Sequence, residues 1–294
     1  GSATGRNVLE WPLGRFRESA GDGEFTIDPP AGTTTMRASL AAARAADPDH
    51  SRHEWGPFAP HVLPARLPVG ASMSYRFDAD EVQVNPSRFA TEKTHVAFEG
   101  ETAWGDAARF AFHVTSSDWQ ESDQVLAGIL TDFGAKTGPV AFGGRGDFDG
   151  AMTGSFRRPR VEGVFNGEDM RAWDTLWGDG SARIVVENSY LTVTGGTVRH
   201  DGSEIRADGR FSLGYPRRDG GEEIDARIRV SRRDGDSLRH AFAIDAYPVS
   251  GRMSGEFSLR GGYETPIGFG AMTIEDGVAY GQPFERGTSS LRFD

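Results

Sequence analysis

The stretch FDGAMTGSF, at residues 148–156, returns as VSGRMSGEF at residues 249–257. Both copies read apolar, any residue, Gly, any residue, Met, hydroxyl, Gly, any residue, Phe. A chain that repeats one strand-and-turn unit, with polar and apolar residues alternating, builds a long sheet surface and not a single catalytic cleft. The repeat therefore predicts an extended β structure.

The similarity extends over a unit of about a hundred residues. VQV at 82–84 and LTV at 191–193 are each followed sixteen positions later by a glycine, and ARFAFHV at 108–114 has a counterpart in ARIRV at 226–230. We expect one elongated β domain, in which an irregular N-terminal segment (1–72) leads into a first repeat unit (73–181) and a truncated second unit (182–294). The opening Gly-Ser resembles a cloning remnant, and residues 291–293 end where the earlier copy continues. We expect a piece of a longer protein.

Alternation of apolar and polar residues is clearest at residues 224–231, where Ile, Ala, Ile and Val alternate with Asp, Arg, Arg and Ser. An apolar–polar alternation with a period of two residues and one solvent-exposed face is typical of a half-buried antiparallel strand. Dipeptides such as Asn166-Gly167, Asp201-Gly202, Asp208-Gly209 and Asp276-Gly277 are typical of tight hairpin turns. We expect many short strands joined at these turns.

One or two short amphipathic helices interrupt the predicted strands, so the expected class is all-β with minor helix. Asp118 can cap a helix, and Glu121 follows at the spacing of a capping box. The apolar stripe from Val125 to Phe133 then has helical spacing, and Gly134 ends it. Residues 234–247 predict a second helix of about two turns. Residues 36–46 are compatible with a short helix or a strand.

Composition excludes several classes of protein. The net charge is −11, and no stripe of Lys or Arg is present to neutralise phosphates, so we expect no nucleic-acid partner. There is no cysteine, which excludes disulfides and thiolate metal sites. No apolar run approaches the ~20 residues of a membrane-spanning helix.

Candidate metal and phosphate sites are weak. His50 and His53, with Asp47 and Asp49 nearby, have metal-ligand spacing only if this proline-flanked segment is helical, so we expect a solvated loop and no metal. Glycines at residues 144–150 suggest a phosphate loop, but a strand follows them where a phosphate loop requires a helix. The Arg-Gly-Asp tripeptide within this segment is common by chance.

Acidic residues near tryptophan suggest a carbohydrate site. Asp174 lies between Trp173 and Trp177, and glycosidases use paired carboxylates beside aromatic platforms. The alternative is that these acids occupy turns while the tryptophans pack in the core, or that residues 172–179 form a helical turn at one end of the sheet. There is no Gly-x-Ser-x-Gly elbow. We expect no enzyme activity, no catalytic residues and no cofactor.

Several phrases in a fixed order resemble AsmA-like proteins of the TamB type. They are DWQESD at 118–123, TGPVAFG at 137–143, PRVEG at 159–163, GRFSLGYP at 209–216 and GVAYGQPF at 277–284. The resemblance covers the chain from about Val69 to its end. It implies a β-taco, an elongated curved sheet with an apolar inner groove. It also implies the periplasmic portion of an inner-membrane-anchored protein that moves phospholipid, with an outer-membrane barrel of the BamA/TamA type as partner.

A groove of this kind would shield acyl chains from water. Each buried methylene contributes about 0.8 kcal/mol, so a chain of ~16 carbons loses roughly a dozen kcal/mol when exposed. In a β-strand, every second side chain points to the same face, so alternating apolar residues would line the groove. The predicted lining residues are Val82, Val84, Val96, Phe98, Phe110, Phe112, Val114, Leu191, Val193, Ile205, Phe211, Leu213, Ile224, Ile228, Val230, Phe257 and Leu259. Two alternatives stay open: a periplasmic scaffold whose sheets enclose a dry core, and a carbohydrate-binding β protein.

Overall fold

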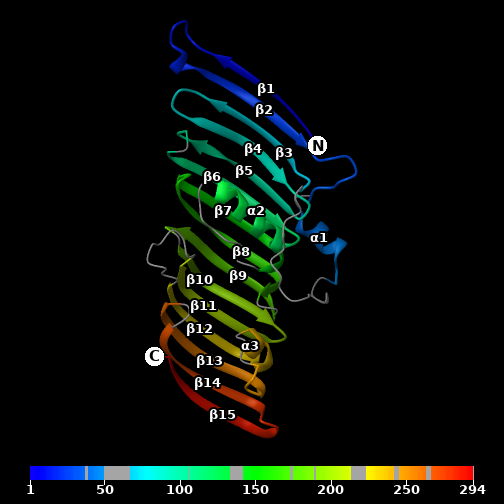
Figure 1. The fold of residues 1–294 in the computed structure, drawn as a ribbon, viewed down its shortest axis with the longest axis vertical. Coiled ribbons are helices and arrows are strands. Elements are labelled where there is room, and N and C mark those ends of the chain that lie inside the picture. Colours follow the sequence, from blue (N-terminus) through cyan, green and yellow to red (C-terminus); the bar gives the residue numbers. More distant parts are fainter. Residues whose placement is uncertain are drawn as a thin grey trace.

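The protein is a single open antiparallel sheet with three short α-helices beside it (Figure 1). The computed structural model describes residues 1–36, 39–49, 67–104, 106–132, 142–172, 175–188, 190–212, 223–241, 245–262 and 266–293. The expected all-β class with minor helix is confirmed.

The elements follow one another without crossovers. The strands are β1 (Ser2–Glu10), β2 (Ala20–Asp28), β3 (Gly70–Phe77), β4 (Val82–Ala90), β5 (Thr94–Thr102), β6 (Ala108–Ser116), β7 (Gly143–Ser155), β8 (Arg158–Ala172), β9 (Thr175–Glu187), β10 (Tyr190–His200), β11 (Ser203–Ser212), β12 (Glu223–Asp234), β13 (Val249–Gly262), β14 (Pro266–Ala279) and β15 (Gln282–Phe293). The helices are η1 (Phe16–Glu18), α1 (Leu40–Ala46), α2 (Trp119–Asp132) and α3 (Gly235–Ala241).

The sheet is a meander in which each strand pairs with its neighbours in sequence, and β1 and β15 form its two edges. Fifteen strands at the usual spacing of about 4.8 Å make a sheet roughly 67 Å long. Within the described residues, no helix combines the length and apolarity that crossing a bilayer requires.

The N-terminal segment is more regular than predicted. Residues 2–28 contain β1 and β2, which extend the sheet: β2 pairs with β3, and β1 pairs with β2. The sequence SATGRNVLE of β1 shows little apolar alternation, and nearly all of its side chains are exposed. Backbone hydrogen bonds to β2 hold this edge strand in place. Such bonds do not depend on the side chains, so the sequence of β1 carries no periodic pattern that would predict it.

The helices lie along one rim of the sheet (Figure 1). α2 begins close to the predicted cap, and α1 and α3 lie within the other two segments where helix was considered. The predicted apolar stripe of α2 beyond Val125 falls outside the described side chains. α2 follows β6 and α3 follows β12, so the helix recurs after six further strands. The predicted unit boundary at 181–182 falls inside β9, and the division into two units stays a prediction.

Only one of the four quoted dipeptides forms a tight turn. Asp201-Gly202 joins β10 to β11. Asn166-Gly167, Asp208-Gly209 and Asp276-Gly277 lie inside strands. Asp276 has a φ of 49°, at an irregularity in β14, whereas the other two pairs continue the ladder. Glycine is used there because a Cβ would collide with a neighbour: the Asp225 carbonyl at Gly209, the Met170 side chain at Gly167 and the Phe284 ring at Gly277. Turn statistics do not distinguish this use of glycine from its use in turns.

Few side chains are fully covered. Among described residues, the buried apolar side chains are Val84, Ala90, Ala108, Trp119, Ala226, Val230 and Leu238. The accessible surface is 18243 Å², whereas a compact monomer of 31.9 kDa exposes about 12,000 Å². The described residues contain no second sheet that would cover this one.

Candidate functional site

Strand register assigns each side chain to one of two faces, because directly paired residues share a face. Val96 pairs with Val114, and Phe98 pairs with Phe112. The same row then continues into β7, where Phe112 pairs with Gly150. We call this side the apolar face and the opposite side the polar face.

The second half of the sheet continues the apolar face. Leu191 pairs with Phe211, and Phe211 pairs with Ile224. Ile228 pairs with Phe257 on the next strand. Every predicted lining residue lies on this face except Leu213, which is outside the described residues. Their role in lining a lipid groove stays a prediction.

Further apolar residues belong to this face that were missing from the prediction. They are Phe25, Met73, Tyr75, Phe77, Phe89, Phe148, Met152, Val161, Phe165, Ile184, Val186, Val198, Met253, Met272 and Ile274. Phe148 and Met152 stand in the repeated stretch itself. Both could have been predicted from the sequence, because alternate residues of the strand at 148–156 lie on the same face.

Aromatic rings on the apolar face lie against glycines of the same face. Phe112 and Phe148 have ring centroids 5.7 Å apart, on either side of Gly150. A Cβ placed on Gly150 would meet the Phe148 ring at 2.5 Å and the Phe112 ring at 3.0 Å. The pattern repeats at Gly270, whose added Cβ would lie 2.5 Å from the Phe257 ring. The glycines leave room for rings to lie flat, so the face is a smooth apolar surface.

Most apolar side chains on this face are half-buried and remain within reach of solvent. Ile228, Phe257 and Phe112 fall in this intermediate class, and Val230 is buried. A surface of this kind can accept an apolar ligand without first opening a closed core.

α2 covers the apolar face at its rim. The Trp119 ring lies 5.2 Å from the Phe165 ring, which belongs to β8. Ser122 exchanges hydrogen bonds with Ser116 at 2.6 Å and Thr94 at 2.7 Å. The Glu121 carboxylate accepts the Lys93 amide at 3.0 Å. The first turn of α2 is therefore fixed to the strand ends and is not a free lid.

α3 occupies the equivalent place over β12 and β13, and it also contacts β9. Leu238 is its buried side chain. The preceding strand contributes Arg233, which is only 1% exposed. Its guanidinium donates to the Leu176 carbonyl at 2.7 Å and the Trp177 carbonyl at 3.0 Å. Burial lowers the pKa of Arg233, and the nearby charges of Asp234 and Asp201 oppose this shift. The guanidinium also lies 5.5 Å from the centroid of the Trp177 ring.

A second charged cluster attaches α1 to the same rim. Arg44 forms an ion pair with Glu168, and Arg145 donates to Glu168 at 3.1 Å and to the Asp47 carbonyl at 2.7 Å. The hydrogen bond from Arg44 holds the pKa of Glu168 below its ordinary value, although partial burial opposes the shift. The cluster has a structural role because it joins elements far apart in sequence.

The polar face holds an Asp–His–Thr chain that resembles a proton relay. His113 Nδ1 lies 2.6 Å from Asp149 Oδ1, and His113 Nε2 lies 3.1 Å from Thr115 Oγ1. Thr115 is 2% exposed, so its hydroxyl cannot reach a substrate. The geometry does not support nucleophilic catalysis, which requires an accessible attacking oxygen.

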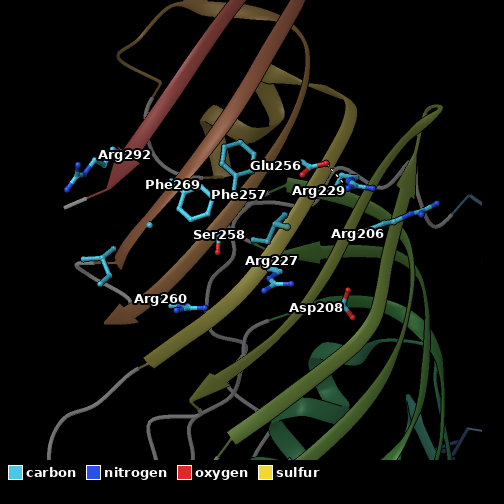
Figure 2. Close-up of a pocket in the computed structure, with 13 residues that line it drawn as sticks. Arg206, Asp208, Arg227, Arg229, Glu256, Phe257, Ser258, Arg260, Phe269 and Arg292 are labelled. Carbon is cyan, nitrogen blue, oxygen red and sulfur yellow. Dashed lines mark ion pairs between the residues drawn. The ribbon is translucent and has the colours of Figure 1, made fainter.

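A hollow also lies mainly on the polar face, over β11–β15, and Ile228 and Phe257 of the apolar face contribute to its lining. Its volume is about 1150 Å³, and Figure 2 shows the arginines that line it, which come from β11, β12, β13 and β15. A smaller hollow of about 450 Å³ lies beside His113 and Asp149. Neither hollow is an enclosed pocket in the apolar face.

The other sequence candidates do not assemble into a site. Residues 144–150 lie within β7, so the phosphate-loop interpretation is wrong. Residues 175–179 are strand, so the helical turn predicted for 172–179 is wrong there, and Trp177 lies beneath Arg233. Trp173, Asp174, His50 and His53 lie outside the described residues. In the part of the chain that the structure describes, no cluster of His, Asp and Glu has a metal-binding arrangement.

No protein-family model matches the chain, and neither does any curated protein or solved structure.

Proposed function

We propose that the apolar face carries the acyl chains of phospholipids and shields them from water. The supporting observation is that apolar side chains continue along the apolar face from β2 to β14. A face about 67 Å long is several times longer than one extended acyl chain, so lipids could follow one another along it. Each buried methylene contributes about 0.8 kcal/mol without any specific polar contact.

The apolar face favours the sliding of a bound lipid over its tight binding at one position. Flat rings over glycine and branched aliphatic side chains offer many equivalent positions, and no converging polar groups on the described part of this face fix a ligand in one place. Binding that is uniform along the face lets a lipid slide, because no position is far below its neighbours in free energy. We propose a non-enzymatic role on this basis.

The wider setting follows from the resemblance to AsmA-like proteins of the TamB type. We propose that the chain is a periplasmic portion of a longer, inner-membrane-anchored protein. In this proposal phospholipid passes between the two membranes of the envelope, and a BamA/TamA-type barrel receives the parent protein at the outer membrane.

A scaffold with a closed dry core is the second candidate. It requires a layer that covers the apolar face, and the described residues provide only helices at one rim. The carbohydrate alternative has less support, because Trp177 is half-buried beneath Arg233 and does not form an exposed platform.

The test compares two substitutions on β12. Ile228→Asp places a charge on the apolar face, whereas Ser231→Asp places the same charge at an exposed position on the polar face. We expect Ile228→Asp to abolish transfer of fluorescent phospholipid between vesicles and to reduce the phospholipid that copurifies, as measured by mass spectrometry. Ser231→Asp should preserve both. Equal transfer by the two variants, with far-ultraviolet circular dichroism unchanged, would count against the proposal.

A further inference from the structure

The polar-face hollow over β11–β15 is lined by five arginines and by the two carboxylates Asp208 and Glu256. Of these arginines, Arg206 forms an ion pair with Glu204, and Arg229 forms one with Glu256. The whole chain has a net charge of −11. A hollow lined by five arginines on an acidic protein is a local feature that the overall composition does not explain.

The two carboxylates are already engaged. Glu256 pairs with Arg229 at 2.6 Å, the ion pair drawn in Figure 2. Asp208 accepts a hydrogen bond from the Gly195 amide at 2.7 Å. Strand register places Arg227 between Asp208 and Ser258. Even so, no ion pair or hydrogen bond joins the Arg227 side chain to any residue that the structure describes.

Two exposed apolar side chains stand beside this arginine on the polar face. Phe269 is 70% exposed and pairs with Ser258, the neighbour of Arg227. Ile267 is 56% exposed and pairs with Arg260. Arg260 lies 3.6 Å from Asp225, a long ion pair that leaves guanidinium donors available. Figure 2 shows Phe269 and Arg260 on one side of the hollow.

We propose that this hollow binds a phosphate ester that carries an apolar group. Arg227, Arg260 and Ser258 bind the phosphate, and Phe269 and Ile267 contact the apolar group. Guanidinium groups offer paired donors that match phosphate oxygens, and such charge-assisted hydrogen bonds are stronger than neutral ones. The volume of about 1150 Å³ exceeds what a free phosphate needs. These five residues lie on the polar face, whereas Ile228 and Phe257, which also line the hollow, belong to the apolar face. The proposal does not depend on the function proposed for the apolar face.

Titration calorimetry with four soluble probes tests the site: dihexanoyl phosphatidylglycerol as monomer, adenosine monophosphate, glycerol phosphate and inorganic phosphate. We expect a probe with both groups to bind more tightly than glycerol phosphate or inorganic phosphate. The lipid and the nucleotide distinguish an acyl group from an aromatic ring as the apolar partner. Arg227→Gln should weaken binding by about tenfold or more, the effect of losing one charge-assisted hydrogen bond.

Two further variants separate the contributions. Phe269→Ser should remove the preference for apolar esters while glycerol phosphate binds as before. Arg183→Gln removes the same charge from an exposed position on the polar face, outside the hollow, and should leave every affinity unchanged. Binding should also weaken as salt rises to about 0.3 M. The proposal is overturned if neither apolar ester binds, or if Arg227→Gln and Arg183→Gln have the same effect.

Discussion

Arg233 donates a hydrogen bond to the Trp177 carbonyl at 3.0 Å, although β10 and β11 separate their strands. Three strand spacings amount to about 14 Å in a flat sheet, too far for a direct hydrogen bond. β9 and β12 both extend past the short β10–β11 turn, and there they converge on the apolar side. The sheet therefore curls toward its apolar face at the rim that carries the helices.

Replacing Arg233 with Met should loosen this curl. The substitution keeps an unbranched chain but leaves the Leu176 and Trp177 carbonyls without their charged donor. We expect a loss of about 2–4 kcal/mol in the free energy of unfolding, measured by urea denaturation. Arg232→Met is the matched control, because Arg232 is exposed and carries the same charge. Similar losses in the two variants would mean that the bridge contributes nothing.

His95 should make stability depend on pH near neutrality. Burial is the main cause that lowers its pKa from 6.5, and the nearby charges of Arg88 and His113 lower it further. Above about pH 6.5 the imidazole is neutral in both states. Below that value the unfolded chain takes up the proton first, so stability falls until the pH passes the folded pKa, with a slope of at most about 1.4 kcal/mol per pH unit.

The measurement is urea unfolding at several pH values between about 7.5 and 5. His95→Leu should remove this part of the pH dependence. His240→Leu, on the exposed surface of α3, should leave it in place. An unchanged slope in His95→Leu would assign the pH dependence to other groups.

The attachment of α1 to the sheet should weaken at acidic pH, because it depends on the ionised Glu168 carboxylate. The hydrogen bond from Arg44 lowers the pKa of Glu168 from 4.5, and Arg145 contributes less. This stabilisation is complete above about pH 4.5 and is lost as the pH falls through the folded pKa. Glu168→Gln should therefore increase amide exchange in residues 40–46 at neutral pH, as acid does in the parent chain. The control is Glu162→Gln, at an exposed position on the same strand, and protection of α1 lost equally in both variants would contradict this account.

Residues 224–231 show why the face assignment could be predicted from the sequence. Each strand in the meander pairs with its neighbour in sequence, so period two within a strand settles which residues share a face once the register is known. Ile228 and Phe257 were both predicted to lie on the apolar side of their strands, and the register makes them direct partners. The start of α2 was predictable because Asp118 acts locally: its carboxylate accepts the Gln120 amide at 3.0 Å. The Glu121 carboxylate instead accepts the Lys93 amide from the β4–β5 connection, a contact that the capping-box spacing does not predict.

Other features depend on contacts that sequence patterns do not encode. Arg233 stands among exposed arginines in the sequence, and only the convergence of β9 and β12 buries it. The hollow around Arg227 requires five strands in register, none of which contains a motif by itself. Asp208-Gly209 has the composition of a hairpin turn, but Gly209 is needed where an added Cβ would meet the Asp225 carbonyl at 2.8 Å.

Gly150 should be intolerant of even one methyl group, since it lies beneath two rings of the apolar face. A Cβ there would meet the Phe148 ring at 2.5 Å, the Phe112 ring at 3.0 Å and the Glu162 carbonyl oxygen at 3.0 Å. The rings can turn aside only by leaving the flat arrangement, and the carbonyl belongs to the neighbouring backbone. Gly150→Ala should therefore cost about 1–3 kcal/mol in the free energy of unfolding.

Gly180 provides the comparison, because it lies on the same face with ordinary space around it. Its added Cβ would lie 3.5 Å or more from the nearest atoms. Gly180→Ala should be neutral or stabilise by about 0.4–1 kcal/mol, since alanine restricts the unfolded chain. Both variants are measured by thermal and urea unfolding, and lipid transfer is assayed in parallel. Gly150→Ala should also slow transfer, because displaced rings roughen the face; if both variants unfold and transfer lipid like the parent chain, the flat arrangement of rings over glycine has no energetic role.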